Sequence, residues 1–246
     1  MTIAIISRKQ PLLPLQYLES LMKYDEQDGW TFFTLNGCPA ELVMSMARLA
    51  VLASTYEKVH TMEWVVFNTF PVEEILEHVQ SWENNEDATA DSIAWTDDDP
   101  ETRRNKFHCI EAWRHSVQLY AYRVFYRPQT TERLRSITHL ARVVLDHVRC
   151  IPDTAVVQKQ TLLPVFLAAS EVGDETTRDF VRQFCRHWSS TARYSMFGTV
   201  VTLLETIWAG WDASTRDVYW WGSKVGNNAS ESASGDEGLI SELLLG

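Results

Sequence analysis

The chain has 246 residues, which is enough for one large domain or for a domain with tails. Hydrophobic residues make up 45% of it and charged residues only 22%, a composition that excludes a wholly disordered protein and supports a sizeable core. The formal net charge of −11 argues against nucleic acid as a partner of the chain as a whole, because phosphate binding needs clustered Lys and Arg.

The first part of the chain predicts helices joined by turns. Residues 12–24 are weakly periodic and are predicted to be helical, whereas the isolated β-prone segment 30–35 (WTFFTL) is interpreted as a packed connector. Asn36-Gly37 is typical of a turn. Pro39 then fits the first turn of a long amphipathic helix, where its missing N–H group is harmless.

Further helices follow on either side of an acidic segment. Pro71 is predicted to open one helix, and the polar, aperiodic residues 83–99 are predicted to form an acidic loop. Two long helices come next, separated at Arg127-Pro128, because a residue that precedes proline avoids helical angles. Thr130 is the predicted N-cap of the second of these helices.

The stretch 162–211 indicates where the core lies. It begins with a nearly all-apolar helix (LLPVFLAAS), after which Gly173 is placed to end that helix and Asp174 to cap the next. Two amphipathic helices then end at Trp208 and Trp211. Because a helix that is apolar on every side must be surrounded by other helices, the predicted fold class is all-α, a multi-helix bundle or array.

The composition changes after residue 225. We expect a helical domain over 1–225, and a flexible linker with a disordered, acidic-hydrophobic C-terminal tail over 226–246. Such a tail can fold as a short helix in the groove of a partner, and the alternative is a helix that packs back onto the same domain. The candidate partner-binding residues of the tail are Asp236, Glu237, Leu239, Ile240, Glu242, Leu243 and Leu244.

The four cysteines exclude the usual zinc modules. They lie 35 to 71 residues apart without a CxxC pair, so neither a zinc ribbon nor a zinc cluster is encoded, and they are predicted to be reduced core thiols. No run reaches eighteen apolar residues, and the N-terminal segment has the wrong order for a signal peptide. We therefore expect an intracellular protein that does not enter a membrane.

Charge is distributed unevenly along the chain. Residues 71–102 hold eleven Asp or Glu and no Lys or Arg, whereas 103–149 hold ten Lys or Arg and three acids. The favoured interpretation is that the two segments neutralise one another or face solvent. The alternative is a basic face that lies against DNA or an acidic partner.

The acidic run at 97–101 has one pattern of a possible metal site. Asp97, Asp98 and Glu101 have the DDxxE pattern with which class I terpene cyclases hold magnesium against a diphosphate. Asp99-Pro100-Glu101 is also the ordinary start of a helix, and no convincing second metal-binding run exists elsewhere. Capping is therefore favoured, and a magnesium-dependent cyclase on this scaffold is kept as the enzyme alternative.

Other catalytic patterns do not emerge from the sequence. None of the seven histidines forms an HxxxH pair, so they are interpreted as surface or core residues, and the glycine-rich loops and nucleophile elbows of common enzymes are missing. No catalytic residue, cofactor or metal is predicted. Glu171 and Arg178 flank the 173–174 junction and are expected to bridge it.

The ten tryptophans have two interpretations. Trp64, Trp113, Trp188, Trp208 and Trp211 are expected first of all to fill the core of a bundle. The alternative is a cavity between helices for a small-molecule effector, since ligand sites in bundles lie between helices.

Three blocks together resemble the fungal-specific transcription factor domain. Residues 36–42 (NGCPAEL) are similar to its "GCP-x-E-L" segment, and residues 110–123 (IEAW through LYAYR) to its "LYLYR" helix. Residues 163–171 (LPVFLAASE), with Arg178 and the later LETIW of 204–208, resemble its "PLFIAG-x-E … R … LE-x-VW" ending. Order and spacing hold over about 12–221.

This resemblance implies an α-helical regulatory domain of a fungal nuclear transcription factor, often tied to nutrient use or secondary-metabolite gene clusters. It implies action through protein contacts, sometimes a bound effector, and no catalytic residues. The six-cysteine DNA-binding motif is missing from the sequence, so direct DNA binding by this chain is not expected. The expected partners are a coactivator or a zinc-cluster transcription factor.

Overall fold

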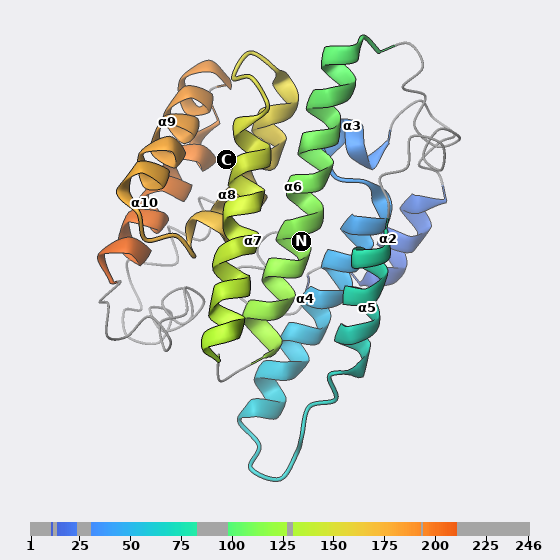
Figure 1. The fold of residues 1–246 in the computed structure, drawn as a ribbon. Coiled ribbons are helices and arrows are strands. Elements are labelled where there is room, and N and C mark those ends of the chain that lie inside the picture. Colours follow the sequence, from blue (N-terminus) through green and yellow to red (C-terminus); the bar gives the residue numbers. More distant parts are fainter. Residues whose placement is uncertain are drawn as a thin grey trace.

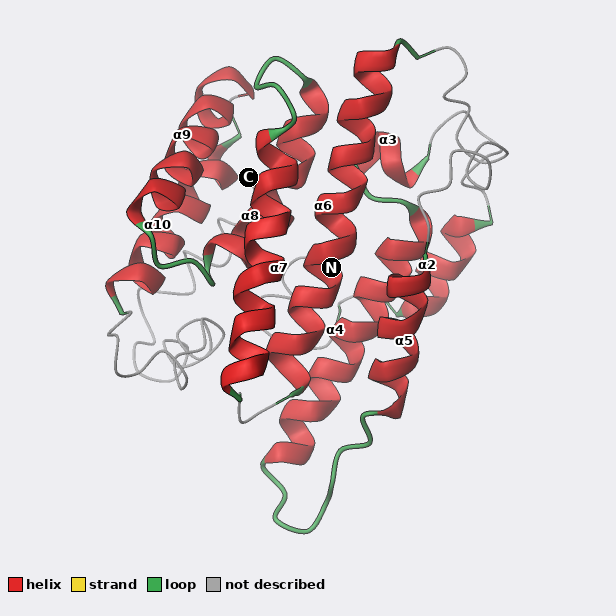
Figure 2. Ribbon diagram, viewed as in Figure 1, coloured by secondary structure: helices red, strands yellow, loops and turns green. Residues whose placement is uncertain are grey.

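The described part of the chain is helical, as Figure 1 and Figure 2 show. The computed structural model describes residues 11, 14–23, 31–82, 98–126, 130–192 and 194–210. Every regular element in these ranges is a helix, which confirms the all-α prediction. No helix among them is both long and apolar enough to cross a membrane. In chain order the elements are α2 (Leu15–Met22), α3 (Phe32–Asn36), α4 (Ala40–His60), α5 (Phe70–Ser81), α6 (Pro100–Phe125), α7 (Thr131–Arg149), the 3₁₀ helix η1 (Val156–Thr161), α8 (Leu162–Ala169), α9 (Glu175–Ala192) and α10 (Ser195–Ala209).

Helices α6 and α7 form the centre of the array. They run side by side and antiparallel, with α4 and α5 packed on one side and α9 and α10 on the other (Figure 1). Helix α8 contacts α6, α7, α9 and α10. All residues from Leu163 to Ala169 are buried, so the prediction of a central apolar helix is confirmed.

Side-chain caps fix where several helices begin. The carboxylate of Asp99 accepts hydrogen bonds from the backbone N–H groups of Glu101 and Thr102 at 2.9 and 3.0 Å, ahead of Pro100 in the first turn of α6. Thr130 caps α7 in the same way, and Asp174 accepts from the N–H of Thr177 at 2.9 Å at the start of α9. These caps confirm the predicted helix starts.

Two predicted boundaries are wrong. Residues 32–36 form the short helix α3 instead of a connector, because Thr31 and Thr34 make a reciprocal capping box at its start. Helix α8 ends at Ala169, before Gly173: the N–H groups of Glu171 and Val172 bond to the carbonyls of residues 168 and 169, which tightens the chain into a turn.

The aromatic residues divide between core and surface. Trp113, Trp188 and Trp208 are buried, as predicted, whereas Trp211 lies outside the described residues. Trp64 is 91% exposed, so its assignment to the core is wrong. It lies in the connection between α4 and α5, where Phe67, which is partly buried, packs against the core instead.

Three of the four cysteines are buried thiols, as expected. Cys150 is exposed, and its assignment to the core is wrong because it is the C-cap residue of α7.

Candidate functional site

The three sequence blocks described above meet inside the helical array. In the first block Gly37 has a φ of 73°, in the left-handed region, and ends α3. A Cβ atom there would lie 2.7 Å from Cβ of Gln160 and 2.9 Å from Sγ of Cys109. The thiol of Cys109 donates a hydrogen bond to the carbonyl oxygen of Gly37 at 3.3 Å. The first block is therefore fixed against α6 and η1 by an approach that only glycine permits.

The buried thiols near this contact are poor candidates for nucleophilic chemistry. Burial raises the pKa of Cys109 well above its ordinary value, and burial followed by the proximity of Cys109 raises the pKa of Cys38. Burial also raises the pKa of Cys185 to about 12. Because the thiolate is the reactive form, these three groups stay uncharged at neutral pH and serve packing.

An ion pair joins the second block to the third. Nε of Arg123, on α6, lies 3.0 Å from Oε1 of Glu171, directly after α8. The two side chains are only 6% and 7% exposed. The pairing offsets part of the large desolvation cost that a charge carries in the interior. Helix α6 and the end of α8 are locked together at this point.

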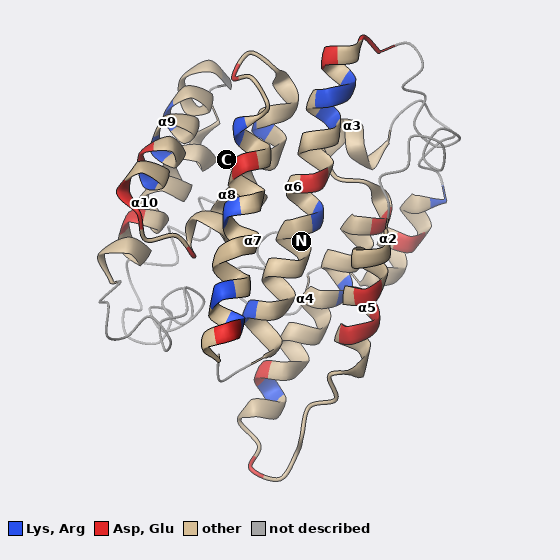
Figure 3. Cartoon of the chain, viewed as in Figure 1, with Lys and Arg blue, Asp and Glu red and all other residues tan. Residues whose placement is uncertain are grey.

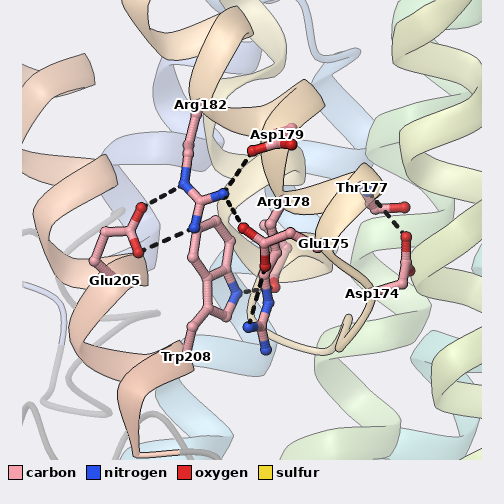
Figure 4. A network of polar contacts seen from close by, with 9 residues as sticks. Asp174, Glu175, Thr177, Arg178, Asp179, Arg182, Glu205 and Trp208 are labelled. Atoms are coloured by element: carbon pink, nitrogen blue, oxygen red, sulfur yellow. Dashed lines mark hydrogen bonds and ion pairs between the residues drawn. The ribbon is translucent and has the colours of Figure 1, made fainter.

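A second polar network ties α9 to α10, and Figure 4 shows it from close by. The guanidinium of Arg182 donates to both carboxylate oxygens of Glu205 at 2.6 and 3.2 Å, a bidentate pair. Its Nη1 atom lies 2.5 Å from Glu175 and 2.7 Å from Asp179, on the other side of the guanidinium. The hydrogen bond from Arg182 is the main cause that lowers the pKa of Glu205.

Trp208 connects the same network to α8. Its indole N–H donates to the carbonyl oxygen of Ala169 at 2.9 Å, which satisfies a group at the end of α8. The guanidiniums of Arg178 and Arg182 lie 5.2 and 5.1 Å from its ring centroid, as cation–π contacts. Residues of the third block thus hold α8, α9 and α10 in one arrangement. Arg178 also lies 3.8 Å from Glu175, and the predicted bridge from Arg178 to Glu171 stays a prediction.

A cluster of histidines and one carboxylate lies between α6 and α7. Oε2 of Glu111 is 3.5 Å from Nε2 of His115, and one ligand atom from each of Glu111, His115 and His147 lies within 4.8 Å of the others. Nδ1 of His108 is 2.9 Å from Nδ1 of His147. Arg114 donates to both oxygens of Glu111, at 3.1, 3.0 and 2.6 Å.

The charges in this cluster follow from burial and from these contacts. Burial opposes ionisation of Glu111, but hydrogen bonds from His115 and Arg114, with their charges, outweigh it and lower its pKa to about 2. Burial, followed by the neighbouring His108 and His115, lowers the pKa of His147 to about 4. At neutral pH Glu111 is therefore a carboxylate and His147 a neutral imidazole.

The connection between α4 and α5 carries the most exposed apolar side chains of the described residues. The α4–α5 surface consists of Met62, Trp64, Val65, Val66 and Phe70, with Trp64 and Val66 more than 90% exposed. Exposed apolar side chains gathered within one short segment make it a candidate interaction site.

The α4–α5 surface is anchored and has an acidic neighbour. The ring of Phe67 stacks on Phe125 of α6, with ring centroids 5.7 Å apart, and meets Tyr56 of α4 edge-on at 5.1 Å. The surface is therefore held on the array by the aromatic contacts of the partly buried Phe67. Glu73, Glu74 and Glu77 are exposed on α5, which has no Lys or Arg, and Figure 3 shows α5 marked in red alone.

Comparison with protein families gives a match that covers most of the chain. A model described as "fungal specific transcription factor domain" matches residues 3–225. The chain belongs to this family. Comparisons with curated proteins and with solved structures found no match. The three blocks that carry the resemblance thus meet inside a fungal transcription factor domain, where they hold helices together.

The residues predicted from sequence as a partner-binding tail, 236–245, lie outside the described residues of the fungal transcription factor domain, as does Asp97 of the DDxxE run. Asp98 pairs with Lys106, and Asp99 caps α6. Glu101 lies in the first turn of α6, where the helix dipole favours a carboxylate. The described residues of this run, Asp98, Asp99 and Glu101, thus lie at the start of α6 and make contacts there.

Sequence reasoning missed the histidine cluster and the α4–α5 surface. Glu111 and His115 are four residues apart on α6, a spacing that places them on adjacent turns and was a readable signal. The contribution of His147 depends on how α7 packs on α6, which no local pattern encodes. The signal for the surface was the apolar run at 64–67, which has no helical period.

Proposed function

We propose that this chain regulates transcription in a fungal nucleus through contacts with other proteins, and that it does not catalyse a reaction. The family match over residues 3–225 carries this proposal. The genes of nutrient use or secondary metabolism are the expected targets, as the family resemblance implies. The net charge of −11 favours a protein partner over direct DNA binding.

The interior of the array supports a regulatory role. The ion pair of Arg123 with Glu171 and the contacts of Arg182 with Glu205 both join one helix to another element. The side chains that make these contacts stabilise the arrangement of the helices. A rigid array can present a preformed surface to another protein with little change of shape on binding.

The α4–α5 surface is the proposed contact for one class of partner. Its apolar side chains lie next to the exposed carboxylates of Glu73, Glu74 and Glu77. A protein segment with apolar and basic side chains complements both features, because apolar burial supplies affinity and opposite charges set orientation. We assign the surface to such a segment.

The tail is the proposed contact for a coactivator. In residues 236–245 (DEGLISELLL), acidic residues keep neighbouring leucines exposed to a partner, and the leucines can enter an apolar groove as one helix face. Asp236, Glu237, Leu239, Ile240, Glu242, Leu243 and Leu244 are the proposed contact residues.

A reporter assay tests the tail. The chain is fused to a heterologous DNA-binding domain in a fungal host, and reporter transcription is compared with that of a variant that lacks 226–246. The deletion should lower activation while the helical circular dichroism of the purified protein stays unchanged. Unchanged activation would remove the tail from the proposal.

Matched surface variants test the second contact in the same assay. Trp64→Ser with Val66→Ser should reduce the transcriptional effect, because these side chains are exposed and their loss leaves the core intact. Leu35→Ser with Val156→Ser is the control, since both residues are exposed apolar side chains elsewhere on the array. Equal effects of the two pairs would reject the α4–α5 surface as a specific contact.

A further inference from the structure

We propose that Glu111, His115 and His147 bind one divalent transition-metal ion of the zinc class between α6 and α7. The three side chains are the ones that the described part of the chain brings within metal-site distance. This inference concerns a site that the proposed function neither contains nor requires.

Helix geometry supplies two of the ligands. Glu111 and His115 are four residues apart on α6, so their side chains lie on adjacent turns of one face. Their facing atoms, Oε2 and Nε2, are 3.5 Å apart. Two ligands of a tetrahedral zinc ion with bonds of about 2.0–2.1 Å are themselves separated by roughly 3.3 Å. This pair already has the required spacing.

The third ligand comes from the opposite helix. His147 lies in the last turn of α7, and its ligand atom is within 4.8 Å of the other two. Closing from that distance to roughly 3.3 Å takes a small rotation of the side chain. A bound ion would therefore join the middle of α6 to the end of α7.

His108 is placed to orient His147. The two Nδ1 atoms are 2.9 Å apart, which is hydrogen-bond distance. When Nδ1 of His147 donates to Nδ1 of His108, Nε2 of His147 keeps its lone pair for the metal, in the way that hydrogen bonds commonly fix a ligating imidazole. Nδ1 of His115 is buried and makes no hydrogen bond within the described residues, so it is available to carry the imidazole proton and leave the lone pair of Nε2 for the metal.

The donor set selects the class of metal. Magnesium and calcium prefer oxygen ligands throughout, whereas two imidazoles with one carboxylate suit zinc and its neighbours. Three protein ligands leave a fourth position for water.

Arg114 is the group that opposes a cation here. Its guanidinium donates to both oxygens of Glu111, and its Nη2 atom, which a bound metal would displace, also lies 3.3 Å from Nε2 of His115. A carboxylate has about four acceptor positions, so Nε of Arg114 can remain on Oε1 while Oε2 turns to the metal. The competition predicts that removal of the guanidinium strengthens metal binding.

The test uses the full chain, free of any histidine tag and treated with a chelator. Isothermal titration with zinc should give one site, and cobalt in its place should show the strong visible absorption of a tetrahedral ion. His147→Ala and His115→Ala should each weaken binding at least tenfold, and Arg114→Gln should strengthen it. His139→Ala is the matched control, an exposed histidine on the same helix as His147, and should bind as the original chain does.

Two further measurements keep the outcome decisive. Cys150→Ser should bind zinc unchanged, which separates this site from one built on the exposed thiol. If the alanine variants do not fold, zinc should protect His115 and His147, but not His139, from acylation by diethyl pyrocarbonate in the original chain, as mapped by peptide mass spectrometry. No zinc binding, binding that survives both histidine variants, or protection that does not differ between these histidines would each overturn the proposal.

Discussion

The ion pair between Arg123 and Glu171 makes a quantitative prediction. The pair is almost fully buried, with Nε and Oε1 3.0 Å apart. Glu171→Ala would leave a guanidinium in the interior without this carboxylate, and breaking one side of a buried pair costs about 3–5 kcal/mol. A domain of this kind has a total free energy of unfolding of about 5–15 kcal/mol. The substitution should thus remove a large part of the stability.

Urea unfolding followed by circular dichroism measures the loss. With a slope of about 3 kcal/mol/M, the midpoint should fall by roughly 1–1.7 M. Arg123→Met with Glu171→Met should cost less than the sum of the single changes, because both charges of the buried pair are then removed together.

A surface pair is the control for this prediction. Nη1 of Arg149 lies 2.9 Å from Oδ1 of Asp146, almost the same separation, but the side chains are 37% and 66% exposed. Asp146→Ala should therefore cost less than about 1 kcal/mol. A loss at Glu171 as small as the loss at Asp146, or full additivity in the double variant, would refute the reasoning.

Three other predictions follow from named contacts. Gly37→Ala should lower the melting temperature by several degrees in a thermal scan, because φ is positive and a Cβ would meet neighbouring side chains; an unchanged melting temperature would contradict the close approach. Trp208→Phe should cost about 1–3 kcal/mol in urea unfolding, since the buried carbonyl of Ala169 loses the indole donor and keeps only the longer bond from the N–H of Val172, and a neutral effect would show that the indole bond does not hold α10 to α8. The pKa of Glu205 is lowered in the folded state by the hydrogen bond from Arg182, so its stabilisation is present above the unfolded pKa of about 4.3 and is lost as the pH falls through the lower folded value. Unfolding measured from pH 7 to pH 3 should show the difference between the original chain and Glu205→Gln shrink below about pH 4, and a constant difference would argue against this linkage.

Local patterns predicted the elements whose ends depend on nearby atoms. Asp99 and Thr130 cap their helices through N–H groups two or three residues ahead, so a short stretch of sequence contains the whole interaction. The apolar stretch 162–169 likewise predicted a buried helix, because exposure of any of its faces to water is unfavourable. Both features depend on short-range chemistry.

Features that depend on packing escaped prediction. Trp64 is a large apolar residue of the kind that commonly fills a core. In this connection, however, Phe67 stacks on Phe125, and Trp64 is exposed. His147 meets Glu111 only because α7 packs on α6, although the two residues are 36 positions apart in the sequence. These contacts form between separate elements, so the sequence around each residue does not determine them.

The tethered reporter tests the central claim most directly. The full chain, fused to a heterologous DNA-binding domain, should change reporter transcription relative to the DNA-binding domain alone, and Trp64→Ser with Val66→Ser should weaken that change. No transcriptional effect of the tethered chain in a fungal host would contradict the claim that it regulates transcription through protein contacts.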